Sequence, residues 1–199
     1  MHNLIFQQSS THPEDSDLWL INEEFIYFQG SSESLLKNIK YRGMPVFKDD
    51  SELSKEEKDY RFKQGGDAQL KRTDILLFPK ESKCIIIELK APDVDVSEHL
   101  NQINRYASLI NNLSKNSLRF SSFFGYLIGE NIDIDSIRDA DADFKSAYNL
   151  DYYFRPHKAV AGKFGREDGS LYTEIIKYST LLERAKLRNA IFIEKLEKE

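Results

Sequence analysis

Two carboxylates and one amine stand at the ends of two apolar segments in the middle of the sequence. Asp74 lies at the start of TDILLF (73–78), Glu88 lies near the end of CIIIEL (84–89), and Lys90 follows directly. Carboxylate oxygens, with water and a substrate phosphate, make the hard-oxygen site that Mg²⁺ or Mn²⁺ prefers. A metal there could lower the pKa of a bound water and stabilise charge on a scissile phosphate. Lys90 could hold or help deprotonate the attacking water.

The two apolar segments predict an antiparallel β-hairpin, because both are rich in β-branched residues and the short segment 79–83 separates them. Such a hairpin places the start of its first strand beside the end of its second. Glu88 and Lys90 are two residues apart and therefore share one face of the strand. The three consecutive isoleucines at 85–87 predict a strand that is buried on both faces.

A helix is predicted from about Ser97, because apolar residues recur at helical spacing at positions 100, 103, 107 and 110. Gln102 and Tyr106 are four residues apart, so they are neighbours at the edge of this apolar stripe. Gln102 could order a metal-bound water or contact a phosphate. The alternative is an exposed amide that satisfies nearby backbone groups.

The remaining segments complete a layered pattern of helices and strands. Strands are predicted at 17–28, 122–128, 152–155 and 174–178, and a short helix capped by Ser31 and Ser32 is predicted at 32–40. Residues 48–72 are expected to form a loop with a helical turn near 53–60, and the acidic segment 130–150 to be irregular. A last helix is expected with Thr180 as its N-cap, and Glu183, three residues on, completes a capping box. This order predicts an α/β fold with a mixed β-sheet flanked by helices.

Composition limits the class of protein and its partners. The chain has 199 residues and a formal net charge of −5. Its single cysteine, Cys84, excludes an internal disulfide and a cysteine-rich zinc module. No apolar run reaches the roughly 20 residues of a membrane span, and the N-terminus lacks a signal-peptide pattern, so we expect a cytoplasmic protein. Residues 1–17 are expected to be a polar arm and 18–199 one domain.

The set formed by Asp74, Glu88-Leu89-Lys90 and Gln102-x-x-x-Tyr106 resembles the PD-(D/E)XK nuclease superfamily. Within it, the nearest likeness is to Shedu-type antiphage nuclease domains and to the nuclease domains attached to histidine-kinase-like ATPases. Thr73 stands where a proline is frequent, but that proline is not a metal ligand. The likeness extends from Thr73 to about residue 113, and more loosely over 123–130 and 178–196.

This resemblance implies a restriction-endonuclease-like core and assigns roles to the residues named above. Asp74 and Glu88 would ligate Mg²⁺ or Mn²⁺, and Lys90 and Gln102 would complete the catalytic set. Tyr106 would help order the water or contact the substrate. Many members also place an acidic residue of the first helix near the metal, for which Glu33 is the candidate here; the alternative is a favourable charge in a helix's first turn.

The function expected from these observations is that of a metal-dependent endonuclease acting on DNA, in antiphage defence or DNA processing. The acidic net charge lacks the basic surplus usual for a free-standing nucleic-acid binder, so DNA would be met by a local patch, another domain or another subunit. We accordingly expect a homo-oligomer, and an N-terminal regulatory or ATPase domain outside this chain is possible. The alternative is a catalytically silent nuclease fold that serves as a binding or assembly module.

Overall fold

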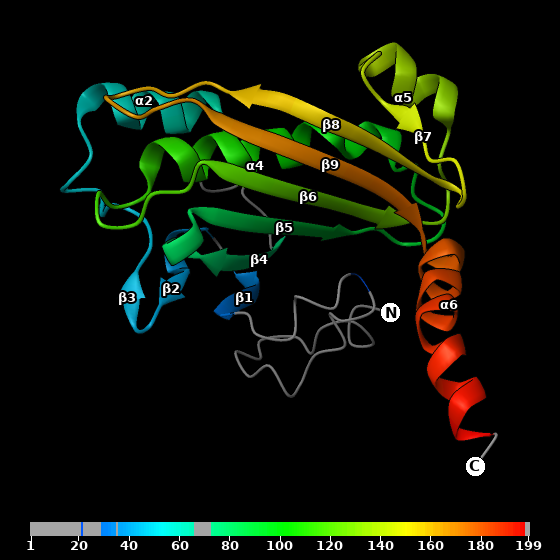
Figure 1. Ribbon diagram of the computed structural model, residues 1–199. Coiled ribbons are helices and arrows are strands. Elements are labelled where there is room, and N and C mark those ends of the chain that lie inside the picture. Colours follow the sequence, from blue (N-terminus) through cyan, green and yellow to red (C-terminus); the bar gives the residue numbers. More distant parts are fainter. Residues whose placement is uncertain (1–20, 22–28, 35, 66–72, 198–199) are drawn as a thin grey trace.

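A seven-stranded β-sheet forms the centre of the molecule (Figure 1). The computed structural model describes residues 21, 29–34, 36–65 and 73–197. The order of strands across the sheet is β1-β4-β5-β6-β9-β8-β7, and β2 and β3 form a separate pair. The strands are β1 (Gln29–Ser34), β2 (Lys40–Tyr41), β3 (Met44–Pro45), β4 (Thr73–Phe78), β5 (Lys83–Leu89), β6 (Ser122–Gly129), β7 (Lys145–Ser146), β8 (Tyr152–Val160) and β9 (Gly169–Lys177).

The sheet is mixed, with a parallel centre and antiparallel flanks. Strands β5, β6 and β9 run parallel to one another, whereas the pairs β1–β4, β4–β5, β8–β9 and β7–β8 are antiparallel. A parallel pair needs a crossover connection, and helix α4 (Leu100–Leu113) supplies it between β5 and β6. The carboxyl ends of β5, β6 and β9 therefore meet at one end of the sheet. The predicted β4–β5 hairpin and the α/β fold with a mixed, restriction-endonuclease-like sheet are confirmed.

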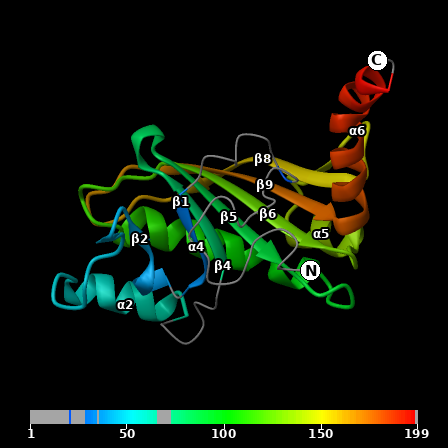
Figure 2. The same ribbon diagram turned by 90° about the horizontal axis from the view of Figure 1, so that it is seen from below.

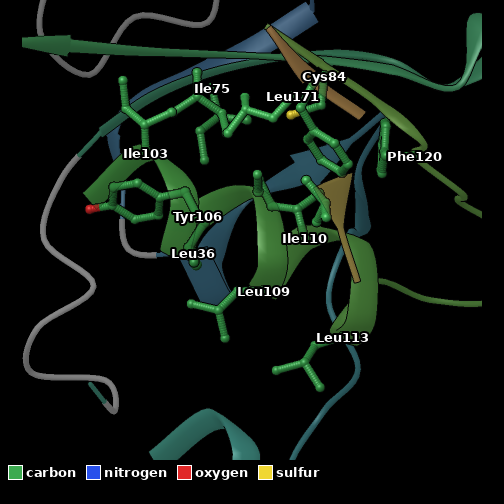
Figure 3. Close-up of a cluster of buried hydrophobic side chains, with 14 of the residues drawn as sticks. Leu36, Ile75, Cys84, Ile103, Tyr106, Leu109, Ile110, Leu113, Phe120 and Leu171 are labelled. Atoms are coloured by element: carbon green, nitrogen blue, oxygen red, sulfur yellow. The ribbon is translucent and has the colours of Figure 1, made fainter. Parts of the chain in front are cut away.

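Both faces of strand β5 are buried, as its run of isoleucines predicts. Ile86 belongs to the cluster between the sheet and α4, together with Ile75 and Ile103. Figure 3 shows this cluster, in which side chains of α4 pack against strand residues. Ile85 and Ile87 belong to a second cluster on the opposite face. Burying apolar side chains of this size contributes about 1.5–3 kcal/mol each, so the strand that carries Glu88 is firmly held.

The helices cover the sheet unequally. Helix α4 lies along one face, and α6 extends away from the end of the sheet (Figures 1 and 2). Helix α2 begins with a capping box in which Ser54 and Glu57 bond each other's backbone amides. The other helices are α2 (Lys55–Lys63), α5 (Ile134–Ala140), α6 (Tyr178–Leu196) and the 3₁₀ turns η4 (Leu36–Asn38), η5 (Pro79–Glu81) and η6 (Ser97–His99). No described helix combines the length and apolar character that a membrane span requires.

The N-terminal segment departs from the sequence-based expectation. The predicted helix at 32–40 is wrong: residues 29–34 form the edge strand β1, and the short 3₁₀ turn η4 follows before β2 begins at Lys40. The backbone of β1 bonds to β4, a non-local pairing that the local serine pattern does not reveal. The polar arm at 1–17 lies outside the described residues, as does the strand predicted at 17–28 apart from Ile21, which is buried.

Three further boundaries differ from the prediction. The acidic segment contains α5, which Asp133 caps, and the short strand β7, so it is not wholly irregular. Strands β8 and β9 are longer than predicted and form an antiparallel pair with a bulge between Arg155 and Lys158. Helix α6 begins at Tyr178, and the hydroxyl of Thr180 donates to the backbone oxygen of Asp151 instead of capping the helix.

Candidate active site

The carboxyl end of β5 and the first turns of α4 bring four of the predicted residues together. The Nζ atom of Lys90 lies 2.7 Å from Oε1 of Glu88 and 3.3 Å from Oε1 of Gln102. The Nε2 atom of Gln102 in turn donates to the hydroxyl of Tyr106 at 3.3 Å. The four side chains thus form one continuous polar chain, which runs from the strand to the helix.

The position of Gln102 follows from the amphipathic character of α4. The helix buries Ile103 against the sheet, and the preceding residue Gln102 then faces the end of β5 at the margin of the apolar contact. Tyr106, one turn further, is 2% exposed and packs in the core. Its hydroxyl points away from the apolar side chains in Figure 3. The helix therefore holds the amide of Gln102 between a buried phenol and the amine of Lys90.

Glu88 and Lys90 form an ion pair that is largely shielded from water. The side chain of Glu88 is 8% exposed and that of Lys90 is 13% exposed. Charges this buried lose much of their hydration, so each is stabilised by the other, and Lys90 also by the amide oxygen of Gln102. An ammonium donates at most three hydrogen bonds, and two of them fix the direction of this one. The amine is thereby held at a defined place beside a carboxylate.

Asp74 is placed only by its backbone. The β4–β5 register pairs it with Ile87, the residue before Glu88, so the two acidic residues lie at the same end of the hairpin but at positions that alternate between the two faces of the sheet. Its side chain is outside the described part of the structure, and its role as a metal ligand stays a prediction. Glu33 falls in a bulge of β1 between the pairs Ser31–Ile75 and Ser34–Thr73, level with Asp74, rather than on a helix.

The donor chemistry of this end of the sheet suits a hard divalent cation. The carboxylate of Glu88 and the amide oxygen of Gln102 are oxygen donors, the type that Mg²⁺ and Mn²⁺ select. Among the described side chains, no group of three or more His, Cys, Asp or Glu residues could hold a metal ion.

Cysteine chemistry has no place at this site. Cys84 begins the buried part of β5 and is 0% exposed. Burial raises the pKa of its thiol well above the ordinary value, which suppresses the reactive thiolate. Cys84 is therefore a core residue of β5.

Sequence reasoning missed two residues that border the site from the other parallel strands. The hydroxyl of Tyr178, the first residue of α6, donates to the backbone oxygen of Lys90 at 2.9 Å. Glu130, directly after β6, accepts from the backbone amide and the hydroxyl of Ser179 at 3.2 and 2.8 Å. Both residues follow strands that run parallel to β5. A sequence-based prediction that β5, β6 and β9 are parallel would have placed both residues near the end of β5.

Comparison with known protein families adds one finding to this geometry. Residues 53–132 match the family model of the type I restriction enzyme R protein N terminus. This part of the chain is similar to a restriction-enzyme domain. The match covers about two fifths of the chain and includes Asp74, Glu88, Lys90, Gln102 and Tyr106. No curated protein and no solved structure matches the chain.

Proposed function

We propose that this protein is a metal-dependent nuclease that hydrolyses phosphodiester bonds, with DNA as its substrate. The observation that carries the proposal is the junction of Glu88, Lys90 and Gln102, which come from a strand and a helix and meet at one end of the parallel strands. Support comes from the restriction-enzyme match, which contains all three residues. The resemblance to PD-(D/E)XK nucleases, and to Shedu-type domains among them, rests on the same positions.

Each side chain has a role that its surroundings allow. Glu88, together with Asp74, would hold Mg²⁺ or Mn²⁺, which when bound would supply charge stabilisation at the phosphate and a more acidic water. Lys90 would orient the attacking water and balance the negative charge that develops on the phosphate oxygens. Gln102 accepts a hydrogen bond from the amine of Lys90 and would offer its amide to the same water. Tyr106 fixes the amide of Gln102 from the core side.

The net charge of the chain does not favour the approach of DNA to the site. The whole chain carries −5, whereas residues 151–199 contain 10 basic and 8 acidic side chains. Because DNA is repelled by a net negative surface at long range, a second subunit or an attached domain would help to bring it near. We therefore include in the proposal a homo-oligomer and a regulatory or ATPase domain, with antiphage defence or DNA processing as the biological setting.

A plasmid-nicking assay tests the proposal. Supercoiled plasmid is incubated with the purified chain in Mg²⁺ or Mn²⁺, beside an EDTA control and the variant Lys90→Ala. Lys83→Ala is the matched control, because Lys83 lies on the same strand and pairs with Glu81 away from the site. We expect metal-dependent nicking by the natural chain and by Lys83→Ala, and a loss of at least about 100-fold in Lys90→Ala. Nicking that survives in Lys90→Ala would contradict the proposed role.

One observation favours a second candidate, a nuclease fold that binds nucleic acid or assembles a larger protein without cutting. The amine of Lys90 occupies an oxygen of Glu88, which a metal would otherwise use. If this ion pair persists in Mg²⁺, it competes with the metal for the Glu88 carboxylate and weakens loading of the site. Equal DNA binding in EDTA and in Mg²⁺, with no turnover in either, would support the silent module; turnover in Mg²⁺ would exclude it.

A further inference from the structure

The main chain of Lys90 is held from two sides. Its backbone amide donates to the backbone oxygen of Ile128 on β6 at 2.8 Å. Its backbone oxygen accepts from the hydroxyl of Tyr178 on α6 at 2.9 Å. Lys90 is the first residue after β5, so its carbonyl lies just beyond the end of the strand. The hydroxyl of Tyr178 therefore supplies the hydrogen bond to this carbonyl.

The close packing around Lys90 leaves its backbone little freedom. A Cβ atom added at Gly129 would lie 3.4 Å from Cβ of Lys90 and 2.4 Å from Cγ2 of Val96. A side chain larger than that of glycine does not fit at position 129, because the chain after β5 packs against the end of β6. On the remaining side, the phenol of Tyr178 closes the arrangement with a half-buried ring. Burial raises the pKa of this phenol, so it stays protonated and able to donate at neutral pH.

Helix α6 is attached to the sheet at the same place. Besides the Tyr178 contact, Ser179 bonds Glu130, and Arg184 donates to Glu174 at 3.0 Å one to two turns further along. Of these contacts, the one from Tyr178 reaches the strand that carries Glu88. The phenol is consequently the direct link between α6, which extends away from the sheet, and the candidate active site (Figure 1).

We infer that Tyr178 is a positioning residue for Lys90: its hydroxyl fixes the carbonyl of Lys90, and through it the amine that faces Glu88 and Gln102. Any force that displaces the first turn of α6, from a partner or from a second copy of the chain, acts on Lys90 through this bond. The expected effect of Tyr178 on activity rests on the proposed nuclease function. Its expected effect on the position of Lys90 does not rest on that function, so the two effects are tested separately.

The first test measures the position of Lys90 without reference to activity. Tyr178→Phe removes the hydroxyl and keeps the ring, and Tyr172→Phe is the matched control. Tyr172 is also half-buried, and its hydroxyl donates to Glu174 at 2.8 Å, away from Lys90. The rate at which acetic anhydride labels Lys90 is followed by mass spectrometry, with Lys83 as the internal reference. We expect labelling of Lys90 to rise about fivefold in Tyr178→Phe, as the loss of one typical hydrogen bond allows, and to stay unchanged in Tyr172→Phe.

The second test uses nicking activity in saturating Mg²⁺. Tyr178→Phe should lower kcat about tenfold with KM changed by less than about twofold, since a misplaced group costs rate more than binding. In a Lys90→Ala background the same substitution should cause no further loss, because the residue that it positions is gone.

The outcomes separate the inference from the proposed function. Unchanged labelling of Lys90 in Tyr178→Phe overturns the positioning role, as does an equal rise in Tyr172→Phe. A full additional loss of activity in the Lys90→Ala background also overturns it. Raised labelling in a protein whose natural form nicks no plasmid supports the positioning role and contradicts the nuclease function alone.

Discussion

The amine of Lys90 lies 2.7 Å from Oε1 of Glu88, in a buried ion pair between two residues of one strand end. Side chains two residues apart share one face of a strand, so the local sequence alone brings the two charges together. Burial comes from α4, which covers that face and adds Gln102 to the pair. The strand thus brings Glu88 and Lys90 together, and helix α4, which follows in the chain, shields the pair from water.

The buried ion pair predicts that its two members are coupled in stability. Removal of either charge takes the 2.7 Å counter-charge away from the other buried group, a loss of about 3–5 kcal/mol in the strongest cases. We expect Glu88→Gln and Lys90→Met to lower the free energy of unfolding individually, and the double variant to recover a large part of the loss. Urea denaturation of the four proteins measures this coupling. Effects that add within about 0.5 kcal/mol would show that the two residues do not depend on each other.

Gln102 is predicted to matter for activity more than for stability. Gln102→Leu keeps the size and helical preference of the side chain but removes the acceptor for Lys90 and the donor to Tyr106. We expect nicking in Mg²⁺ to fall about 10- to 100-fold, the range typical of a misplaced catalytic group. Asn101→Leu, at an exposed position in the same helical turn, is the control and should retain activity. Equal activity in both variants would contradict a role for Gln102.

The sequence predicted those parts of the site that depend on local periodicity. The isoleucine run defined β5, and apolar spacing defined α4. These patterns left open where Gln102 points, and its place beside Glu88 and Lys90 was implied by the resemblance to PD-(D/E)XK nucleases. Edge strand β1 could not be predicted in this way. Its residues are polar, and β4 supplies its pairing from some 40 residues away in the chain.

Tyr178 illustrates a second reason for the difference between sequence and structure. The end of β9 was correctly predicted as a strand, but nothing local says that β9 runs parallel to β5 and ends beside Lys90. The order of strands in a sheet is a property of the whole chain. Contacts at the meeting point of several strands therefore appear only when that order is known.

Gly125 is predicted to set the distance between α4 and the sheet. A Cβ atom at this position would lie 2.5 Å from Cγ2 of Ile103, closer than real contacts allow. Gly125→Ala should therefore destabilise the protein by about 1–3 kcal/mol, as overpacked cores do, and should also lower activity because α4 carries Gln102.

Removal of the opposing side chain tests the cause. Ile103→Ala alone should cost about 2–5 kcal/mol, since it empties a core position. Combined with Gly125→Ala, it should cost clearly less than the two losses together, because the new methyl group enters the vacated space. Thermal unfolding followed by circular dichroism gives all four stabilities. Additive losses would mean that Gly125 is required for a reason other than its contact with Ile103.

The Asp141–Arg155 pair predicts a pH dependence of stability that is independent of the active site. Arg155 is 2% exposed, and its guanidinium bonds Asp141 at 2.5 Å and Thr173 at 2.9 Å. Lys158 also donates to Asp141, at 3.1 Å. Burial acts to raise the pKa of Asp141, but the hydrogen bonds from Lys158 and Arg155 outweigh it and hold the pKa below the ordinary value of 3.8. Asp141 therefore binds its proton less readily in the folded than in the unfolded chain.

A carboxyl group with a lowered pKa stabilises the folded state fully above its ordinary pKa, and loses this contribution as the pH falls through the folded value. At pH 7, Asp141→Asn should lower the free energy of unfolding by about 2–4 kcal/mol, because Arg155 remains buried without this counter-charge. The urea midpoint should fall accordingly. The difference from the natural protein should shrink as the pH is lowered from about 4 towards the folded pKa. Asp139→Asn, at an exposed position of α5, should follow the natural protein at every pH. A difference for Asp141→Asn that stays constant down to pH 3 would show that the charge of Asp141 is not what stabilises the fold.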